Sequence, residues 1–425
     1  MPEAEEGGKK PRDRTYLRLS VMQFFFWFGA ATGTYLTVFL LQRGFQPSQV
    51  GFITATNSAV VILAGPFWGT IADKVRSIRK VFLFCMAVSI VLWTLVPLSA
   101  RIFLGPIDFP WGVFGPLALM YLVIPMSAFF RMPAHSLMDA YTVQNSHLGG
   151  VSYGHVRLWG SIGWTVMCMI LSYLLPRWGV ETAFYMYGLA FLPIYLLMWG
   201  AKGSDVVKAS KEKRTFKSMG FGRLFKSYYF ITYLFFAMLM HMPVVVSMTY
   251  LPFLVDSVGG DTAMIGLVAG YKALLEIPTL LLMKPLREKF PLPVAIGTAA
   301  VLYIIEALLY TRVTHFYQII ALQTLHGLGG GFMIGAATNY VYTMAPEGLN
   351  STAHTMLGAV NSTAGIIGSI AGGFLIMAVG ISRSYFFIAI TLCFALIYFI
   401  GTFVVGVKVL KIPIPFQKNP EPVSK

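Results

Sequence analysis

Apolar runs long enough to cross a lipid bilayer recur along the whole length of this 425-residue chain. An α-helix rises 1.5 Å per residue, so about 20 apolar residues span a hydrocarbon core roughly 30 Å thick. By this measure the sequence predicts twelve membrane-spanning helices, and the predicted fold class is an all-α membrane protein. Only 12% of the residues are charged, which excludes the ordinary soluble globular class. The predicted spans are 16–41, 48–72, 81–99, 113–143, 151–175, 182–200, 226–255, 262–283, 292–311, 315–343, 351–378 and 384–407.

Basic residues are distributed unevenly between the two sides that these spans define. If the N-terminus is cytoplasmic, the inner segments carry most of the lysines and arginines, whereas the outer loops carry few. Those few are Arg43, Arg101, Arg177, Arg312 and Arg383. This positive-inside bias predicts a multi-pass protein of the inner or plasma membrane with both termini in the cytoplasm. It also accounts for the net charge of +15 without a nucleic-acid partner.

The longest polar segment, 201–225, divides the predicted spans six and six. The sequence therefore predicts an N-terminal six-helix lobe (1–200) and a cytoplasmic central loop (201–225). A C-terminal six-helix lobe with a cytoplasmic tail (226–425) follows. This layout is typical of two-lobed transporters whose binding site lies near the bilayer midplane. The alternative is two packed helical bundles joined by a linker, with no transport role.

Two opposite charges interrupt neighbouring spans in the first half. Asp139 and Arg157 each lie about nine residues, or roughly 13 Å, from the turn at 147–150. Each charge costs about 2.5–3.5 kcal/mol to insert alone, so their matching depth predicts a pair that lines a polar cavity. Trp164 follows Arg157 by two helical turns on the same face and offers a flat surface for a sugar ring or an aromatic group. Packing alone is the alternative role for this tryptophan.

The second half carries its own charges within the predicted spans. Counting about ten residues from the turn near Thr314 places Glu306 and His326 at similar depth. Lys272 shares that level, and Glu276 lies one turn further along the same face, so the four side chains could meet in one aqueous cavity. A carboxylate that alternates between a dry environment and a cationic partner binds and releases a proton, so this set predicts proton coupling. The alternative is a static network of ion pairs.

Two more polar residues lie within predicted spans, and the sequence assigns neither a definite role. Arg131, two turns before Asp139, either neutralises that carboxylate or attracts an anionic substrate. His241, beside Pro243, is expected to make a helix contact. The three cysteines lie in separate apolar spans, so we expect no disulfide, metal site or cofactor.

The loop after the second predicted span combines a glycine, an aspartate four residues later and a basic cluster. Its principal residues are Gly69, Asp73, Arg79 and Lys80. We expect Gly69 to allow close helix approach, and Asp73 to bind basic groups or a helix terminus, so that the loop latches an inward gate. This spacing resembles the signature of the major facilitator superfamily, although the corresponding loop of the second half lacks it.

Nearly the whole chain resembles the oligosaccharide:proton symporters of that superfamily and their related phenylpropionate-permease and nucleoside-symporter group. Asp139 and Arg157, followed by a glycine-rich helical turn and Trp164, resemble the lactose permease branch, in which the matching positions bind a galactoside. The sequence around Arg157, Tyr-Gly-x-Val-Arg-Leu-Trp-Gly-Ser, more closely resembles that of the phenylpropionate permeases. The motif Gln-Thr-Leu-His, from Gln323 to His326, resembles the tenth-helix motif of the family and implies contact with substrate or proton.

The same resemblance has departures in the second half. Glu276 resembles a carboxylate of the eighth helix, but Gly329 occupies the position of an acidic residue that is central to proton coupling in the lactose permease branch. Glu306 replaces an arginine of the ninth helix, and Lys272 restores a positive charge from the neighbouring helix. The resemblance therefore implies that the proton resides on Glu306 or Glu276.

These observations predict a monomeric carrier that works by alternating access and couples a small-molecule substrate to protons across the lipid bilayer. A sugar or glycoside is the favoured substrate, and an aromatic acid or a nucleoside is the next. Proton-driven export of hydrophobic compounds is a further alternative. No hydrolase triad, paired catalytic aspartates or zinc motif is present in the sequence, so we expect no enzymatic activity.

Overall fold

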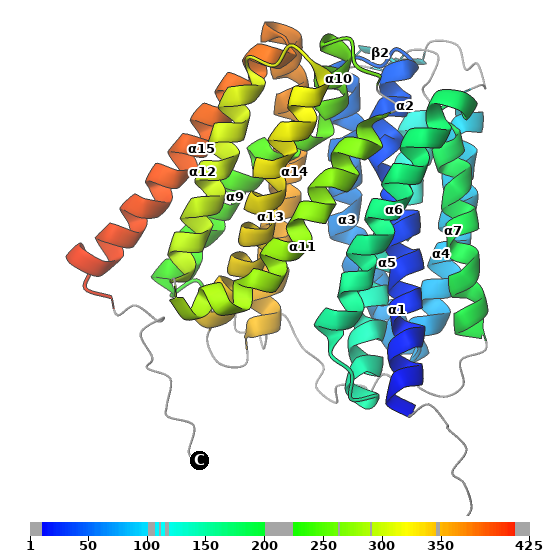
Figure 1. Cartoon of the computed structure of the whole chain (residues 1–425), viewed down its shortest axis with the longest axis horizontal. Helices are drawn as coiled ribbons and strands as arrows, with labels where there is room; N and C mark the ends of the chain where they lie inside the picture. Colours follow the sequence, from blue (N-terminus) through cyan, green and yellow to red (C-terminus); the bar gives the residue numbers. More distant parts are fainter. Residues whose placement is uncertain are drawn as a thin grey trace, which may run out of the picture. The chain divides into compact units, whose positions relative to one another are not determined.

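The computed structural model of the protein describes residues 11–100, 107–109, 112–114, 119–199, 224–261, 264–289, 291–345 and 349–412. The predicted central loop lies outside these residues except at its last two positions, and the predicted cytoplasmic tail lies outside them beyond residue 412. Long helices form almost all of the described chain (Figure 1). They are α1 (Pro11–Ala30), the 3₁₀ helix η1 (Ala31–Tyr35), α2 (Leu36–Gln42), α3 (Pro47–Val75), α4 (Ile78–Ser99), α5 (Met120–Leu148), α6 (Tyr153–Trp178), α7 (Thr182–Trp199), α9 (Tyr228–Thr249), α10 (Leu251–Ser257), α11 (Ile265–Lys289), α12 (Leu292–Tyr310), α13 (Phe316–Met344), α14 (Asn350–Val379), α15 (Ile381–Val404) and the π-helix η3 (Val405–Val409).

These helices confirm the predicted all-α membrane fold of twelve spans in two six-helix lobes. Ten helical segments of the described chain are long and apolar enough to cross a membrane. The other two predicted spans correspond to α5 and α11, which carry Asp139 and Glu276 within their length. Large apolar side chains such as Leu63 and Leu196, each 69% exposed, lie on outer faces where lipid would cover them.

The structure differs from the predicted spans at two places in the first half. The predicted start of the fourth span at residue 113 is wrong. A short antiparallel hairpin, β1 (Ile107–Phe109) with β2 (Gly112–Phe114), pairs Asp108 with Val113, and α5 begins only at Met120. The first predicted span is not one regular helix, because η1 separates α1 from α2. A 3₁₀ segment in the middle of a helix changes the backbone hydrogen-bond register and often marks a functional position.

The described chain forms two compact units, and each is built around its own core. Unit 1 contains Met1–Arg43, Val60–Ala209 and Ala263–Ala273, and in it α1 packs against α5, α6 and α7 while α4 packs against α5 and α7. Unit 2 contains Gly44–Ala59, Ser210–Thr262 and Leu274–Lys425. In unit 2, α12 packs against α13 and α15, and α9 packs against α14 and α15.

Two helices are divided between the units. The chain of α3 belongs to unit 2 up to Ala59 and to unit 1 from Val60 onward. The chain of α11 has the opposite division, with Ala273 the last residue in unit 1 and Leu274 the first in unit 2. These are the second span of the first half and the second span of the second half, so the exchange is symmetric in the sequence. The predicted lobe boundaries at 200 and 226 do not include this exchange.

The buried Tyr250 fixes the first part of α3 within unit 2. Its hydroxyl donates to the carbonyl oxygen of Ser369 on α14 at 2.6 Å and lies 3.1 Å from the carbonyl oxygen of Pro47 on α3. We expect Tyr250→Phe to lower the apparent melting temperature of the purified protein by a few degrees, because a buried hydrogen bond is worth about 1 kcal/mol and its acceptor would be left unpaired. Thermal unfolding in detergent measures this. Tyr342→Phe, at a position 63% exposed, is the matched control and should leave the temperature unchanged.

Candidate functional site

Close approach between α1 and α6 builds the candidate site of unit 1. A Cβ atom added at Gly163 would lie 2.2 Å from the backbone oxygen of Phe24, and one at Gly160 would lie 2.4 Å from the Trp27 ring. Only glycine at these two positions permits this helix separation, since real Cβ atoms essentially never come closer than 3.0 Å to another heavy atom. The glycine-rich turn that follows Arg157 therefore brings the charged face of α6 onto the aromatic face of α1.

Asp139 of α5 is held by polar groups of α1. The Gln23 side-chain amide donates to Asp139 Oδ1 at 3.4 Å and to Thr142 Oγ1 at 2.8 Å. Trp27 Nε1 donates in turn to Gln23 Oε1 at 3.0 Å. This chain of hydrogen bonds fixes both faces of the Gln23 amide and keeps a half-buried carboxylate in a polar setting.

Arg157 lies over the Trp27 ring, with its guanidinium carbon 4.0 Å from the ring centroid. The ring of Trp164 is tilted against the same indole, at 6.1 Å between centroids. The phenol of Tyr153 lies close enough to interact with both Asp139 and Arg157. Among the described residues no direct ion pair joins Asp139 to Arg157, so these two charges are bridged by Tyr153 rather than paired as the sequence predicted.

Three residues of this cluster were not identified from the sequence. Gln23 and Trp27 lie one turn apart on the first span, and their spacing shows only that they share a face. His135 of α5 packs between Phe26 and Trp27, at 5.0 and 5.2 Å between ring centroids. The signal for His135 was present, because it falls one turn before Asp139 on the same helical face.

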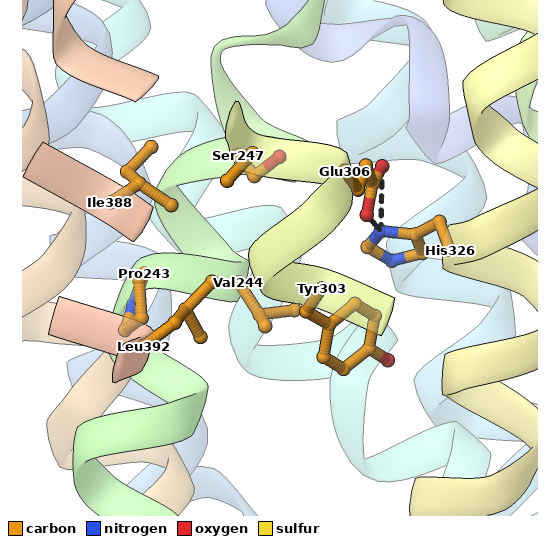
Figure 2. A pocket seen from close by; sticks show the side chains of 9 residues that line it. Pro243, Val244, Ser247, Tyr303, Glu306, His326, Ile388 and Leu392 are labelled. Atoms are coloured by element: carbon orange, nitrogen blue, oxygen red, sulfur yellow. Dashed lines mark hydrogen bonds and ion pairs between the residues drawn. The ribbon is translucent and has the colours of Figure 1, made fainter. Parts of the chain in front are cut away.

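Unit 2 contains a buried acid–imidazole pair, which meets the expectation that Glu306 and His326 lie at equal depth. His326 Nδ1 lies 2.9 Å from Glu306 Oε2 and 3.2 Å from Oε1, and both side chains are at most 5% exposed (Figure 2). The Tyr303 ring packs on the imidazole at 4.9 Å between centroids. A short hydrogen bond in so dry a setting fixes the orientation of the imidazole.

Gln323 lies one turn before His326 on α13 and is also buried. Its amide nitrogen donates to Tyr310 Oη at 2.7 Å, whereas its carbonyl oxygen is enclosed without a hydrogen-bond partner in the described structure. Buried polar atoms are almost always satisfied, so this oxygen lacks the donor that a buried acceptor ordinarily has.

Glu276 and Lys272, one turn apart on α11, belong to different units. Glu276 lies against α13, where a Cβ atom at Gly330 would be 3.1 Å from its carboxylate oxygen, and it is near Tyr303. Lys272 lies near Cys168 of α6. The predicted common cavity of these two residues with Glu306 and His326 stays a prediction.

A small pocket lies beside the Glu306–His326 pair (Figure 2). Its remaining walls are mostly apolar and come from α9, α12 and α15, through Pro243, Val244, Ser247, Tyr303, Ala307, Ile388 and Leu392. The pocket has room for about one water molecule, which is too little for a sugar. It can hydrate the carboxylate but not hold a substrate.

The predicted gating loop connects α3 to α4. Ser77 caps α4 by accepting a hydrogen bond from the Lys80 backbone nitrogen at 3.2 Å, and the Arg79 guanidinium donates to a carbonyl near the end of α7 at 3.1 Å. Asp73 is exposed. A Cβ atom at Gly69 would meet nothing within 4 Å, so no described residue makes the close approach expected at this glycine. The gating role of the loop stays a prediction.

The remaining two polar residues lie in different surroundings. Half-buried His241 lies on α9, and nothing in its surroundings assigns it a role. Arg131 of α5 is 7% exposed and lies over the Trp93 ring of α4, with the guanidinium carbon 4.2 Å from the centroid. No carboxylate of the described chain pairs with Arg131, so the structure does not support neutralisation of Asp139.

Comparison with known proteins gives a consistent result across sequence and structure. The maltose permease of Geobacillus stearothermophilus is 23% identical over 386 residues, which cover 89% of this chain and 91% of the permease. A putative sugar efflux transporter of Deinococcus radiodurans is 25% identical over 356 residues, covering 80% of this chain and 84% of that protein. The crystal structure of the nucleoside transporter NupG superimposes with a TM-score of 0.73 at 16% identity, covering 93% of this chain and 99% of NupG, and shows the same fold.

The profile of the MFS_1 like family matches residues 16–388, which is most of the chain and includes the charged residues of both units. Both curated relatives match over nearly their full length, and the shared fold is that of a major facilitator transporter. Membrane-spanning helices with a polar cluster held by close glycine contacts in one unit, and a buried acid–imidazole pair in the other, suit a membrane carrier. The chain therefore belongs to the MFS_1 like family of the major facilitator superfamily, and it is a multi-pass membrane transporter rather than an enzyme.

Proposed function

We propose that the protein is a proton-coupled symporter of a small organic solute, with a sugar or glycoside as the favoured class, and that it works by alternating access. The cluster of Asp139, Arg157 and two indoles carries this proposal. Charged hydrogen-bonding groups beside flat aromatic surfaces are what a hydroxylated ring requires, because the ring has polar edges and apolar faces. The names of the two curated relatives, a maltose permease and a putative sugar efflux transporter, support the same class.

Proton coupling is assigned in this proposal to Glu306 and His326. A nearly fully buried carboxylate with a single basic partner changes its proton affinity whenever that partner moves or water reaches it. Glu276 and Lys272 on α11 are proposed to take part in the same exchange, and Gln323 is proposed to accept a hydroxyl of the solute.

The remaining features of the proposal concern organisation in the membrane. We infer a monomer in the cell membrane. Both termini are proposed to lie in the cytoplasm, because the basic residues concentrate in the inner segments. The loop containing Gly69, Asp73, Arg79 and Lys80 is proposed to act as a gate between the cytoplasm and the cavity.

The test is transport by Arg157→Ala in proteoliposomes. We expect solute uptake to fall by at least about 100-fold, since losing a charged hydrogen-bonding partner of the bound solute costs about 3 kcal/mol of binding. Uptake is measured with radiolabelled maltose, lactose, uridine and 3-phenylpropionate, and proton movement is measured in parallel as solute-dependent alkalinisation outside the vesicles. Arg177→Ala is the matched control, because Arg177 also lies over an aromatic ring, Tyr173 at 3.8 Å, but on an exposed face.

The control should transport as the wild type does, and both variants should reach the membrane in equal amounts. Normal uptake by Arg157→Ala would refute the assignment of this cluster as the substrate site. Wild-type uptake without alkalinisation would refute proton symport while leaving the site assignment intact.

Export is the second candidate, because one relative is described as a putative sugar efflux transporter. The direction is decided by vesicles of known orientation. Accumulation in right-side-out vesicles under an inward proton gradient indicates symport, whereas accumulation only in inverted vesicles under the opposite gradient indicates export.

A further inference from the structure

Arg131 is a buried cation in the interior of unit 1. It lies on α5, over the Trp93 ring of α4, beside Gly33 of η1 and near Tyr187 of α7. The side chain is 7% exposed, and a Cβ atom at Gly33 would lie 3.0 Å from its terminal nitrogen Nη1. An arginine at this depth requires groups that replace the water it has lost.

The described structure does not supply those groups. Arg131 makes no hydrogen bond or ion pair to any described residue, and its Nε is enclosed without a partner. Its terminal nitrogens are not among the fully enclosed atoms, so the small exposed part of the side chain includes these donors. The Trp93 ring supplies an attraction to the flat face of the guanidinium but leaves its in-plane N–H groups unsatisfied.

Arg157 is a second cation in the same region of unit 1. His135, one turn along α5 from Arg131, lies near the guanidinium groups of both arginines. Arg157 rests on Trp27 and also has no direct ion pair among the described residues. Asp139, the carboxylate of this cluster, is already engaged by Gln23 and Tyr153. Two permanent positive charges therefore lie near His135, and neither makes a direct ion pair with a carboxylate of the described chain.

We propose that Arg131 binds an anionic group of the transported solute, so that the substrate is an organic anion such as an acidic sugar or another carboxylate-bearing ring. The carboxylate receives the in-plane N–H groups of Arg131, and the ring of the solute lies toward Arg157 and the indoles. Symport of one proton with one such anion is electrically neutral. This inference rests on the proposed transport function and narrows its substrate class.

The melting temperature of the ligand-free protein distinguishes a structural role of Arg131 from a ligand-binding role. If Arg131 stabilised the fold, its removal would lower the melting temperature, as the loss of a buried, well-paired residue does. If Arg131 instead serves to bind a ligand, replacing this unpaired charge with an apolar side chain of similar length leaves the melting temperature of the ligand-free protein unchanged or raises it.

The experiment uses the full-length protein in detergent and two pairs of isosteric probes, acetate with acetamide and benzoate with benzamide. Each probe is added at tens of millimolar, with sodium chloride matching the ionic strength. Wild type, Arg131→Met and the exposed control Arg177→Met are compared by thermal unfolding. A ligand that binds only the folded state raises the melting temperature, so specific anion binding appears as a difference between each acid and its amide.

We expect at least one acid to raise the melting temperature of the wild type and of Arg177→Met by about 2 °C or more above its amide. Arg131→Met should lose that difference while melting, without probes, no lower than the wild type. Equal effects of acids and amides on the wild type would overturn the proposal, as would equal anion stabilisation of Arg131→Met. A lower melting temperature of Arg131→Met without probes would assign the residue to the fold instead. This assay needs no transport, so its failure is distinct from a failure of the uptake test on Arg157→Ala.

Discussion

Gly163→Ala should lower the apparent melting temperature of the protein by about 5 °C or more and reduce the yield of monodisperse protein. The added methyl group would lie 2.2 Å from the backbone oxygen of Phe24, and this backbone atom cannot rotate away as a side chain could. The α1–α6 pair would have to separate by about 1 Å, which removes dispersion contacts along the whole interface. Because the same interface seats Arg157 on Trp27, solute uptake should fall with stability. Thermal unfolding and size-exclusion chromatography in detergent measure the first effect.

The matched control is Gly154→Ala on the same helix. A Cβ atom at Gly154 would have its nearest neighbour, Ser152 Oγ, at 3.9 Å, which is ordinary contact. Alanine favours helix over glycine by about 1 kcal/mol, so this variant should melt at the same temperature as the wild type or higher. The same glycine-to-alanine substitution is thus expected to lower the melting temperature at Gly163 and to leave it unchanged or raise it at Gly154. If both variants melt as the wild type does, the close α1–α6 contact is not required.

Glu306→Gln should abolish concentrative uptake but leave exchange of solute across the membrane. The glutamine oxygen can still accept a hydrogen bond from His326 Nδ1, so the pair is replaced by a neutral contact of similar shape rather than broken. Without a titratable carboxylate at this position, the proposed proton is no longer carried, and the solute should equilibrate instead of accumulate. Proteoliposomes with an imposed proton gradient measure accumulation, and solute-loaded vesicles without a gradient measure exchange.

Glu181→Gln is the control for this substitution. Glu181 also pairs with a basic residue, Arg43, but both side chains are partly exposed, and such pairs contribute little. Accumulation by this control should match the wild type. Full accumulation by Glu306→Gln would contradict the assignment of the proton to Glu306 and would transfer it to another group, with Glu276 the first to examine.

The sequence predicted those features that follow from local pattern and depth. The turn between α5 and α6 falls where the polar residues lie, and Gly150 adopts a positive φ of 61° there, as expected at a turn that glycine favours. A similar distance from the turn was enough to bring Glu306 and His326 together, because residues equally far from the turn lie at the same level in two antiparallel helices.

The same reasoning could not predict which side chains contact one another at a given depth. Depth placed Asp139 opposite Arg157, but which groups fill the space between them depends on the rotation of each helix and on α1, whose approach is set by Gly160 and Gly163. The spacing placed His135 on the face of Asp139, but that spacing does not show whether the ring packs against aromatic side chains or makes a polar contact. The division of α3 and α11 between the units likewise depends on contacts between residues far apart in the sequence.

That division has a mechanical consequence. A helix anchored at one end in one body and at the other end in a second body must absorb, along its own axis, any displacement of either body. In α3 the change of unit falls at Val60, and Pro66 removes the backbone hydrogen bond to the Ile62 carbonyl; in α11 it falls at Leu274, whose own carbonyl is released by Pro278. Each shared helix is therefore weakened within about one turn of the point where bending stress concentrates, and the two prolines act as paired flexure points.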